Sequence, residues 1–108
     1  MATVRLDGRR MTDRPSFHRE CQAAFGFPDF YGRNMDAWVD CLSTVRDNDG
    51  MTAFKLAAGE TLRIEILHFD ILSTKAPEIL AVLEECTAAV NERTAQIGGK
   101  PALELVLR

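Results

Sequence analysis

The feature that most constrains the fold is the separation of three strand-like runs by long helical segments. Alternating or continuous apolar residues predict strands at 3–7, 62–67 and 102–107. Strands separated by helices need crossover connections, which favours a parallel sheet with right-handed connections. The run at 102–107 is almost continuously apolar, which predicts a strand that is covered on both faces or central in the sheet. The predicted fold class is therefore α/β, in a single domain.

Helices are expected between these strands. Apolar residues recur at helical spacing between Asp13, which is suited to cap a helix, and Gly26, which is suited to stop it. A second helix is expected over 34–45 and a third over 77–94. The order of elements is then β-α-α-β-α-β. Residues 46–61 are expected to form a long, partly polar connection with at most a short helical turn.

Composition and cysteine usage exclude several classes of protein. The 108 residues carry 16 acidic and 13 basic side chains, for a net charge of −3. A general nucleic-acid binder needs clustered Lys and Arg, so we expect no nucleic-acid partner. No stretch approaches the ~20 apolar residues of a membrane span, and the first residues lack the apolar segment of a signal peptide. Cys21, Cys41 and Cys86 are widely spaced, which is typical of buried thiols in a reducing cytoplasm.

The motifs of common enzyme classes are missing. The sequence has no Gly-x-Gly-x-x-Gly, no phosphate-binding loop and no Gly-x-Ser-x-Gly. The only histidines are His18 and His68, and they lack the spacing of a zinc site. His68 lies two residues before Asp70 and could act as a general base, but no nucleophile is evident beside it. We therefore expect both histidines to be structural or solvated, and we expect neither a cofactor nor a metal.

The net charge is concentrated in one segment. Residues 26–50 contain five aspartates and two arginines, while the rest of the chain is balanced. Asp36 and Asp40 are i, i+4 neighbours on the second predicted helix, where like charges cost roughly 0.2–0.5 kcal/mol. Asp36 lies in the first turn, where a carboxylate stabilises the helix dipole. Asp40 lies too far along the helix for this effect and so has the weakest structural explanation.

Two kinds of function could use this pair of aspartates. A cationic protein partner could bind the two carboxylates together with the aromatic side chains of the loop at 27–32. A hydrolase could use them as acid and base, but it would need one carboxylate desolvated in a pocket. A helix face beside a polar loop is convex and exposed to solvent, so it does not provide such a pocket. The sequence therefore favours binding over catalysis.

The run from Phe27 to Leu42 resembles the barstar family of ribonuclease inhibitors. Its pattern is Pro, an acid, two aromatics, Gly, any residue, Asn, an apolar residue and Asp-Ala, followed two residues later by Asp-Cys-Leu. The order of elements also agrees over most of the chain, apart from 46–61. The resemblance implies that residues 1–108 form one barstar-like domain, with a small three-stranded parallel sheet layered against helices.

The resemblance also implies a function and a set of contact residues. The family inhibits a small basic, barnase-like ribonuclease by placing this helix and the preceding loop over the active site. Asp40 then matches the acid that occupies the phosphate-binding site, and Asp36 a second acid on the same face. The predicted partner-binding residues are Asp36, Asp40, Phe30, Tyr31, Gly32, Asn34, Val39, Ser43 and Glu85. A cytoplasmic monomer that is not an enzyme is expected.

Departures from the family pattern keep an alternative open. Arg33 stands where barstar has an acid, Val39 stands where it has an aromatic residue, and 46–61 forms a long connection. A binding module of the same fold for a different cationic protein is therefore the second interpretation.

Several residues near the start of the second predicted helix have expected structural roles. Trp38 is expected in the core, and Gly32 is expected to need a positive φ before the helix. For Phe30 and Tyr31, packing onto the domain's own core and contact with a partner both remain open.

Overall fold

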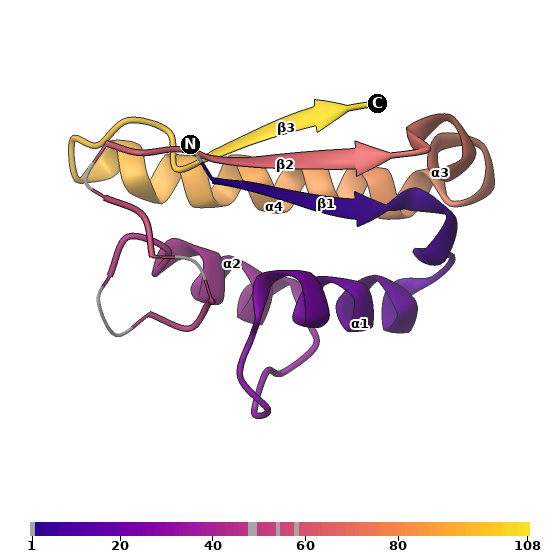
Figure 1. Ribbon diagram of the computed structural model, residues 1–108, viewed down its shortest axis with the longest axis horizontal. Coiled ribbons are helices and arrows are strands. Elements are labelled where there is room, and N and C mark those ends of the chain that lie inside the picture. Colours follow the sequence, from indigo (N-terminus) through magenta and orange to yellow (C-terminus); the bar gives the residue numbers. More distant parts are fainter. Residues whose placement is uncertain (1, 48–49, 54, 58) are drawn as a thin grey trace.

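The computed structural model describes residues 2–47, 50–53, 55–57 and 59–108. The elements in chain order are β1 (Thr3–Asp7), η1 (Gly8–Arg10), α1 (Arg14–Phe25), α2 (Met35–Ser43), β2 (Leu62–Leu67), α3 (Phe69–Lys75), α4 (Pro77–Gln96) and β3 (Leu103–Leu107). The strands form one parallel sheet in the order β1-β2-β3. In Figure 1, α4 runs behind the strands, and α1 and α2 lie below them. The predicted α/β class and the parallel three-stranded sheet are confirmed.

One face of the sheet builds the core. Val4 and Leu6 of β1 lie opposite Ile64 and Ile66 of β2 in the strand register, and all four side chains are buried. Burying such apolar side chains is the main favourable contribution to folding, at roughly 25 cal/mol per Å². The alternation that predicted these strands therefore follows from the helices packed against one face.

The other face of the sheet carries charged side chains, and we call it the charged face. Glu65 is buried at 5% exposure. Its carboxylate accepts a hydrogen bond from Arg5 Nε at 2.9 Å and lies 3.0 Å from Arg108 Nη2. Farther along the sheet, Arg63 Nε lies 3.8 Å from Glu104 Oε2. Glu65 and Glu104 are thus matched by arginines from neighbouring strands or from the residue after β3.

Side-chain caps and buried aromatic residues position α1 and α2. The Asp13 carboxylate accepts a hydrogen bond from Ser16 N at 2.9 Å, and Gly26 ends α1 with φ +70°. The Asn34 side chain likewise caps α2 by accepting from Ala37 N at 2.7 Å. Trp38 is fully buried, as expected. The capping residues and the aromatic core therefore fix where α2 begins and which side of it turns outward.

Three expectations about local structure are wrong: the place of the last strand, the positive φ at Gly32 and the order of elements. The strand β3 is an edge strand with partly exposed residues, because β2 takes the central position. The turn before α2 places Arg33, at φ 53°, in the left-handed region, and Gly32 is not among the residues of positive φ. The elements η1 and α3 were not expected. The described part of 46–61 contains no helix, which agrees with the expected irregular connection.

The connection 46–61 is nevertheless tied to the domain. Ala53 N donates to Phe25 O at 2.8 Å, and Leu56 N donates to Val45 O at 2.9 Å. The Arg46 guanidinium donates to backbone carbonyls at 60, 100 and 101. One of the two arginines in the acidic segment is therefore used to hold backbone together. No helix in the described part of the chain is long and apolar enough to cross a membrane.

Candidate functional site

The outer edge of α2 carries the two aspartates singled out by the sequence. Asp36 and Asp40 are both exposed, and α2 packs along α4, which brings Glu85 to the same side of the molecule. Burial raises the pKa of the Cys86 thiol to about 11, and the carboxylates of Glu85 and Asp36 add to this shift. Glu85 precedes Cys86 on α4 and Asp36 lies on α2, so the two carboxylates act on this thiol from different helices. We call Asp36, Asp40 and Glu85 the acidic face.

Asp40, which has the weakest structural explanation in the sequence, is paired with an arginine in the structure. Arg93, in the last turn of α4, donates from Nη1 to Asp40 Oδ1 at 2.8 Å. The same Nη1 lies 3.4 Å from Ser43 Oγ. The Asp40 and Arg93 side chains remain 57% and 51% exposed, so this ion pair lies at the surface. An exposed pair of this kind contributes about 0–1 kcal/mol to folding, which leaves Asp40 accessible to a stronger partner.

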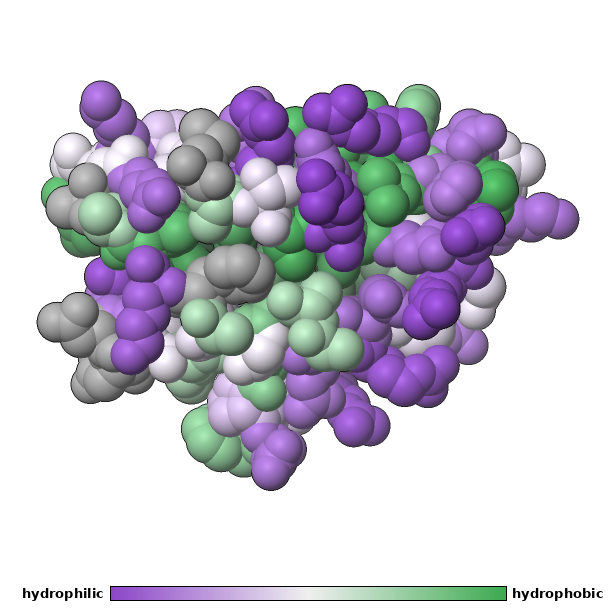
Figure 2. All heavy atoms as spheres, viewed as in Figure 1, coloured by the Kyte–Doolittle hydropathy of each residue, from purple (hydrophilic) through white to green (hydrophobic). Residues whose placement is uncertain are grey.

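The loop between α1 and α2 separates its two aromatic residues. Phe30 is 78% exposed, and Figure 2 shows apolar side chains at the tip of this loop, which projects from the molecule. Tyr31 is buried, its ring packs at 4.6 Å from that of Phe27, and its hydroxyl lies 2.6 Å from His18 Nδ1. Burial raises the pKa of Tyr31, so the phenol stays protonated. Of the two residues, Phe30 can reach a partner, whereas the Tyr31 side chain supports the loop from inside.

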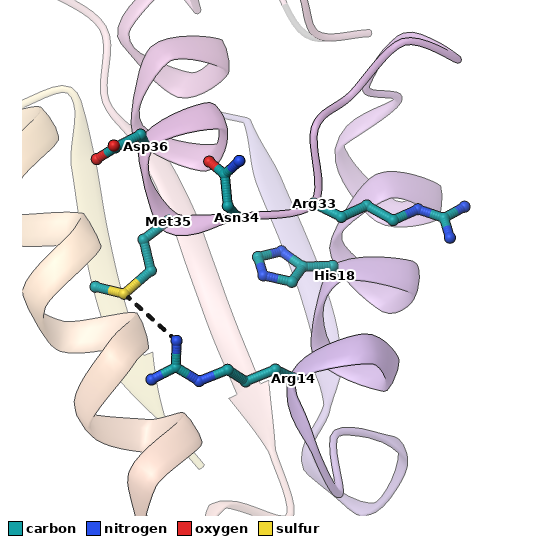
Figure 3. Close-up of a pocket in the computed structure, with 6 residues that line it drawn as sticks. All are labelled: Arg14, His18, Arg33, Asn34, Met35 and Asp36. Carbon is teal, nitrogen blue, oxygen red and sulfur yellow. Dashed lines mark hydrogen bonds between the residues drawn. The ribbon is translucent and has the colours of Figure 1, made fainter.

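An open cavity of about 420 Å³ lies between α1 and the start of α2. Its lining consists of Arg14, His18, Arg33, Asn34, Met35 and Asp36. Figure 3 shows the His18 ring and the Arg14 guanidinium turned toward the space beside Met35, and Arg14 Nη1 lies 4.0 Å from the sulfur. The Arg33 guanidinium points away from it. Burial lowers the pKa of His18, and the positive charges of Arg14 and Arg33 lower it further, so the ring is held neutral.

A second cavity of about 140 Å³ joins the loop to Asp40. Its lining consists of Phe30, Tyr31, Gly32, Ala37, Asp40, Cys41 and Met51. A carboxylate beside apolar side chains suits the hydrocarbon stem and charged end of a long cationic side chain. Asp36 and Asp40 line different cavities, so the structure does not bring them together as the acid and base of one catalytic pocket.

The structure separates the remaining predicted contact residues into two groups. Gly32 and Asn34 are exposed beside the acidic face, and Ser43 is half-buried, donating to Val39 O at 2.6 Å. Val39 itself is buried, as is Tyr31. Sequence reasoning missed Arg93, which lies 53 positions from Asp40 and has no motif around it. Within the described residues, no group of three or more His, Cys, Asp or Glu side chains is arranged to hold a metal ion.

Two comparisons with known proteins match this chain over most of its length. The family model described as Barstar (barnase inhibitor) matches residues 1–106. A protein of Bacillus subtilis (strain 168) named "Putative ribonuclease inhibitor YrdF" is 40% identical over 94 residues. That match covers 85% of this chain and 92% of the relative.

Proposed function

The chain belongs to the barstar family, and from this premise we propose that it inhibits a small basic ribonuclease by covering the enzyme's active site with the acidic face and the tip of the α1–α2 loop. The observation that carries the proposal is the position of Asp36, Asp40 and Glu85 on two packed helices, with Asp40 lining a cavity beside the exposed Phe30. A family of inhibitor proteins also points to a binding function without catalysis.

The proposed mechanism is mimicry of RNA phosphate. A ribonuclease must bind phosphate with cationic side chains, and carboxylates on a rigid helix form charge-assisted hydrogen bonds with the same groups. Asp40 is the proposed anchor, because it lines the small cavity beside Phe30 and its side chain remains 57% exposed. Asp36 would extend the contact along α2, and Glu85 would extend it onto α4. The enzyme is then blocked without any covalent step.

Charge also supports rapid association. The inhibitor has a net charge of −3, and five of its sixteen acids lie within residues 26–50. Opposite charges on the two proteins raise the rate of encounter, by a factor that falls with ionic strength. Asp49, one of these five acids, lies outside the described residues.

We place this activity in the cytoplasm, where an inhibitor could protect the cell from a ribonuclease toxin as an immunity protein. The support is the set of three free cysteines, all buried, that the structure contains. Burial raises the pKa of Cys21 to about 12, so this thiol is neutral and unreactive. Free buried thiols are typical of reducing compartments.

Inhibition of barnase by the purified protein tests the proposal. We expect Asp40→Ala to lose at least tenfold in affinity, about 1.4 kcal/mol. Asp70→Ala is the matched control, because it removes an exposed carboxylate from α3, outside the acidic face, and changes the net charge equally. The control should retain wild-type affinity. Equal losses in both variants would assign the effect to net charge alone and contradict the anchor role of Asp40.

A cationic protein other than a ribonuclease is the second candidate partner. The departures at Arg33, Val39 and 46–61 motivate this candidate. Arg33 is exposed and Met51 of the connection lines the cavity beside Asp40, whereas Val39 is buried. Capture from native lysate on immobilised wild-type protein and on Asp40→Ala would distinguish the two candidates. Partners that depend on Asp40 and include no ribonuclease would replace the first proposal with the second.

A further inference from the structure

The charges around the acidic face are not all negative. Within the described residues, Asp36 and Glu85 form no ion pair, whereas Asp40 is paired with Arg93. Arg93 uses a single nitrogen and contacts a single oxygen of the carboxylate, Oδ1. The face therefore presents two unpaired carboxylates and, beside them, one ion pair in which the cation is half exposed.

We propose that Arg93 is a specificity-determining residue that selects a partner with an acidic side chain opposite it. This proposal rests on the proposed function and deepens it. The partner it describes has cations facing Asp36, Asp40 and Glu85 together with one carboxylate that pairs with Arg93. A partner whose site offers only cations is disfavoured.

Arg93 disfavours a purely cationic partner whether its side chain stays bonded to Asp40 or turns away from it. If Arg93 keeps its bond to Asp40, a fixed cation enters the interface, and like charges facing each other lower affinity. If Arg93 swings away, the ion pair with Asp40 is lost before the partner's cation can replace it. A carboxylate on the partner removes both penalties, because it pairs with Arg93 while a neighbouring cation reaches the other oxygen of Asp40.

The geometry also explains why the effect is local. Arg93 reaches Asp40 from the last turn of α4, while Glu85 lies eight residues earlier, about 12 Å along the helix axis. At 0.15 M ionic strength charges are screened over about 8 Å. Arg93 therefore modifies the Asp40 end of the face and leaves the end formed by Asp36 and Glu85 attractive to cations.

Affinity for barnase, used as a probe with a cationic phosphate site, tests the proposal. We expect Arg93→Ala to bind barnase about three- to fivefold more tightly than the wild type, because an exposed ion pair of up to about 1 kcal/mol no longer has to be broken. Lys75→Ala is the matched control, since it removes one positive charge from α3, outside the acidic face. The control should stay within about twofold of the wild type. Equal or weaker binding by Arg93→Ala would overturn the proposal.

A second measurement needs no ribonuclease. A tetra-arginine peptide is titrated into the wild type and into Arg93→Ala, and backbone amide shifts are followed by NMR. In the wild type the shifts should centre on Asp36 and Glu85, and in the variant they should extend to Asp40. Equal shifts at Asp40 in both proteins would overturn the role of Arg93. Failure of both proteins to bind barnase would count against the proposed target, while this titration still decides whether Arg93 keeps cations from Asp40.

Discussion

The charged face of the sheet and the acidic face of α2 and α4 both present carboxylates, but they use them differently. On the sheet, Glu65 is buried between Arg5 and Arg108. On the helices, Asp36 and Glu85 have no arginine partner within the described residues. The first arrangement satisfies a desolvated charge, and the second leaves solvated charges available. The comparison teaches that carboxylates can be assigned to folding or to binding by whether they are buried: Glu65 is desolvated between its arginines, whereas Asp40 stays 57% exposed although Arg93 pairs with it.

The largest effect should come from removing the buried carboxylate. Glu65→Ala deletes the acceptor for two arginines, and hydrogen bonds to charged groups contribute about 1.5–3 kcal/mol. We expect the free energy of unfolding to fall by about 2–3 kcal/mol, measured by urea denaturation at pH 7. Affinity for barnase should not change. A loss below about 1 kcal/mol would show that the charged face does not stabilise the fold as the comparison requires.

The reverse result is expected on the acidic face. In the double variant Asp36→Asn, Asp40→Asn, the free energy of unfolding should change by less than about 1 kcal/mol, because the repulsion and the exposed ion pair that are lost are both small. Affinity for barnase should fall more than tenfold, about 1.4 kcal/mol. Urea denaturation and inhibition assays on the same preparation measure both quantities. A large loss of stability would make the acidic face structural.

His18 differs from the carboxylates of both faces, because the fold keeps its ring uncharged. Its pKa is lowered in the folded protein, whereas an unfolded histidine titrates near 6.5. As pH falls below about 6.5, protons bind the unfolded chain first, so the free energy of unfolding should fall by at most about 1.4 kcal/mol per pH unit. Urea denaturation at pH 7.5, 6.5 and 5.5 measures the slope.

His18→Gln is the control for this titration and should remove that part of the slope. Asp7 and Asp13 also have lowered pKa values, with hydrogen bonds from Arg9 and Ser16 as the main causes. Their stabilising contributions are lost only as pH falls below about 3.8, so the two ranges separate. An unchanged slope in His18→Gln would exclude His18 as its source.

The smallest effect is expected from the exposed pair on the charged face. Arg63 and Glu104 lie 3.8 Å apart with side chains 37% and 49% exposed. Glu104→Ala should lower the free energy of unfolding by less than about 1 kcal/mol, and the difference should shrink in 1 M salt. Denaturation at low and high salt checks this. A loss as large as that of Glu65→Ala would mean that pairing, and not burial, separates the two faces.

Local signals in the sequence were sufficient for the elements whose ends are set by single residues. Asp13 and Gly26 mark the ends of α1, and Asn34 caps α2. Alternation gave β1 and β2 within their observed bounds. The two exposed aspartates follow from their positions on the second predicted helix, whereas the sequence leaves the exposure of Phe30 open.

Features that depend on distant parts of the chain could not be predicted. An apolar run such as 102–107 does not reveal whether its strand is central, because that depends on which strands pair. The short helix α3 begins after His68, whose left-handed backbone is not signalled by a glycine. The ion pair between Asp40 and Arg93 joins two helices across 53 positions. The sequence does not decide between core packing and partner contact for Tyr31, because only the fold brings its hydroxyl to His18.

The strand register has a consequence for how the protein becomes active. Thr3 lies opposite Arg63, and Leu62 lies opposite Leu103, so every strand pair closes a long loop and no hairpin can form first. Strand pairs with such long sequence separations form slowly, because loop-closure entropy is lost before their contacts form. The acidic face is assembled in the same way, from helices in different halves of the chain. A partly folded chain therefore cannot present its carboxylates together, and the time to an active inhibitor is the folding time of the whole domain.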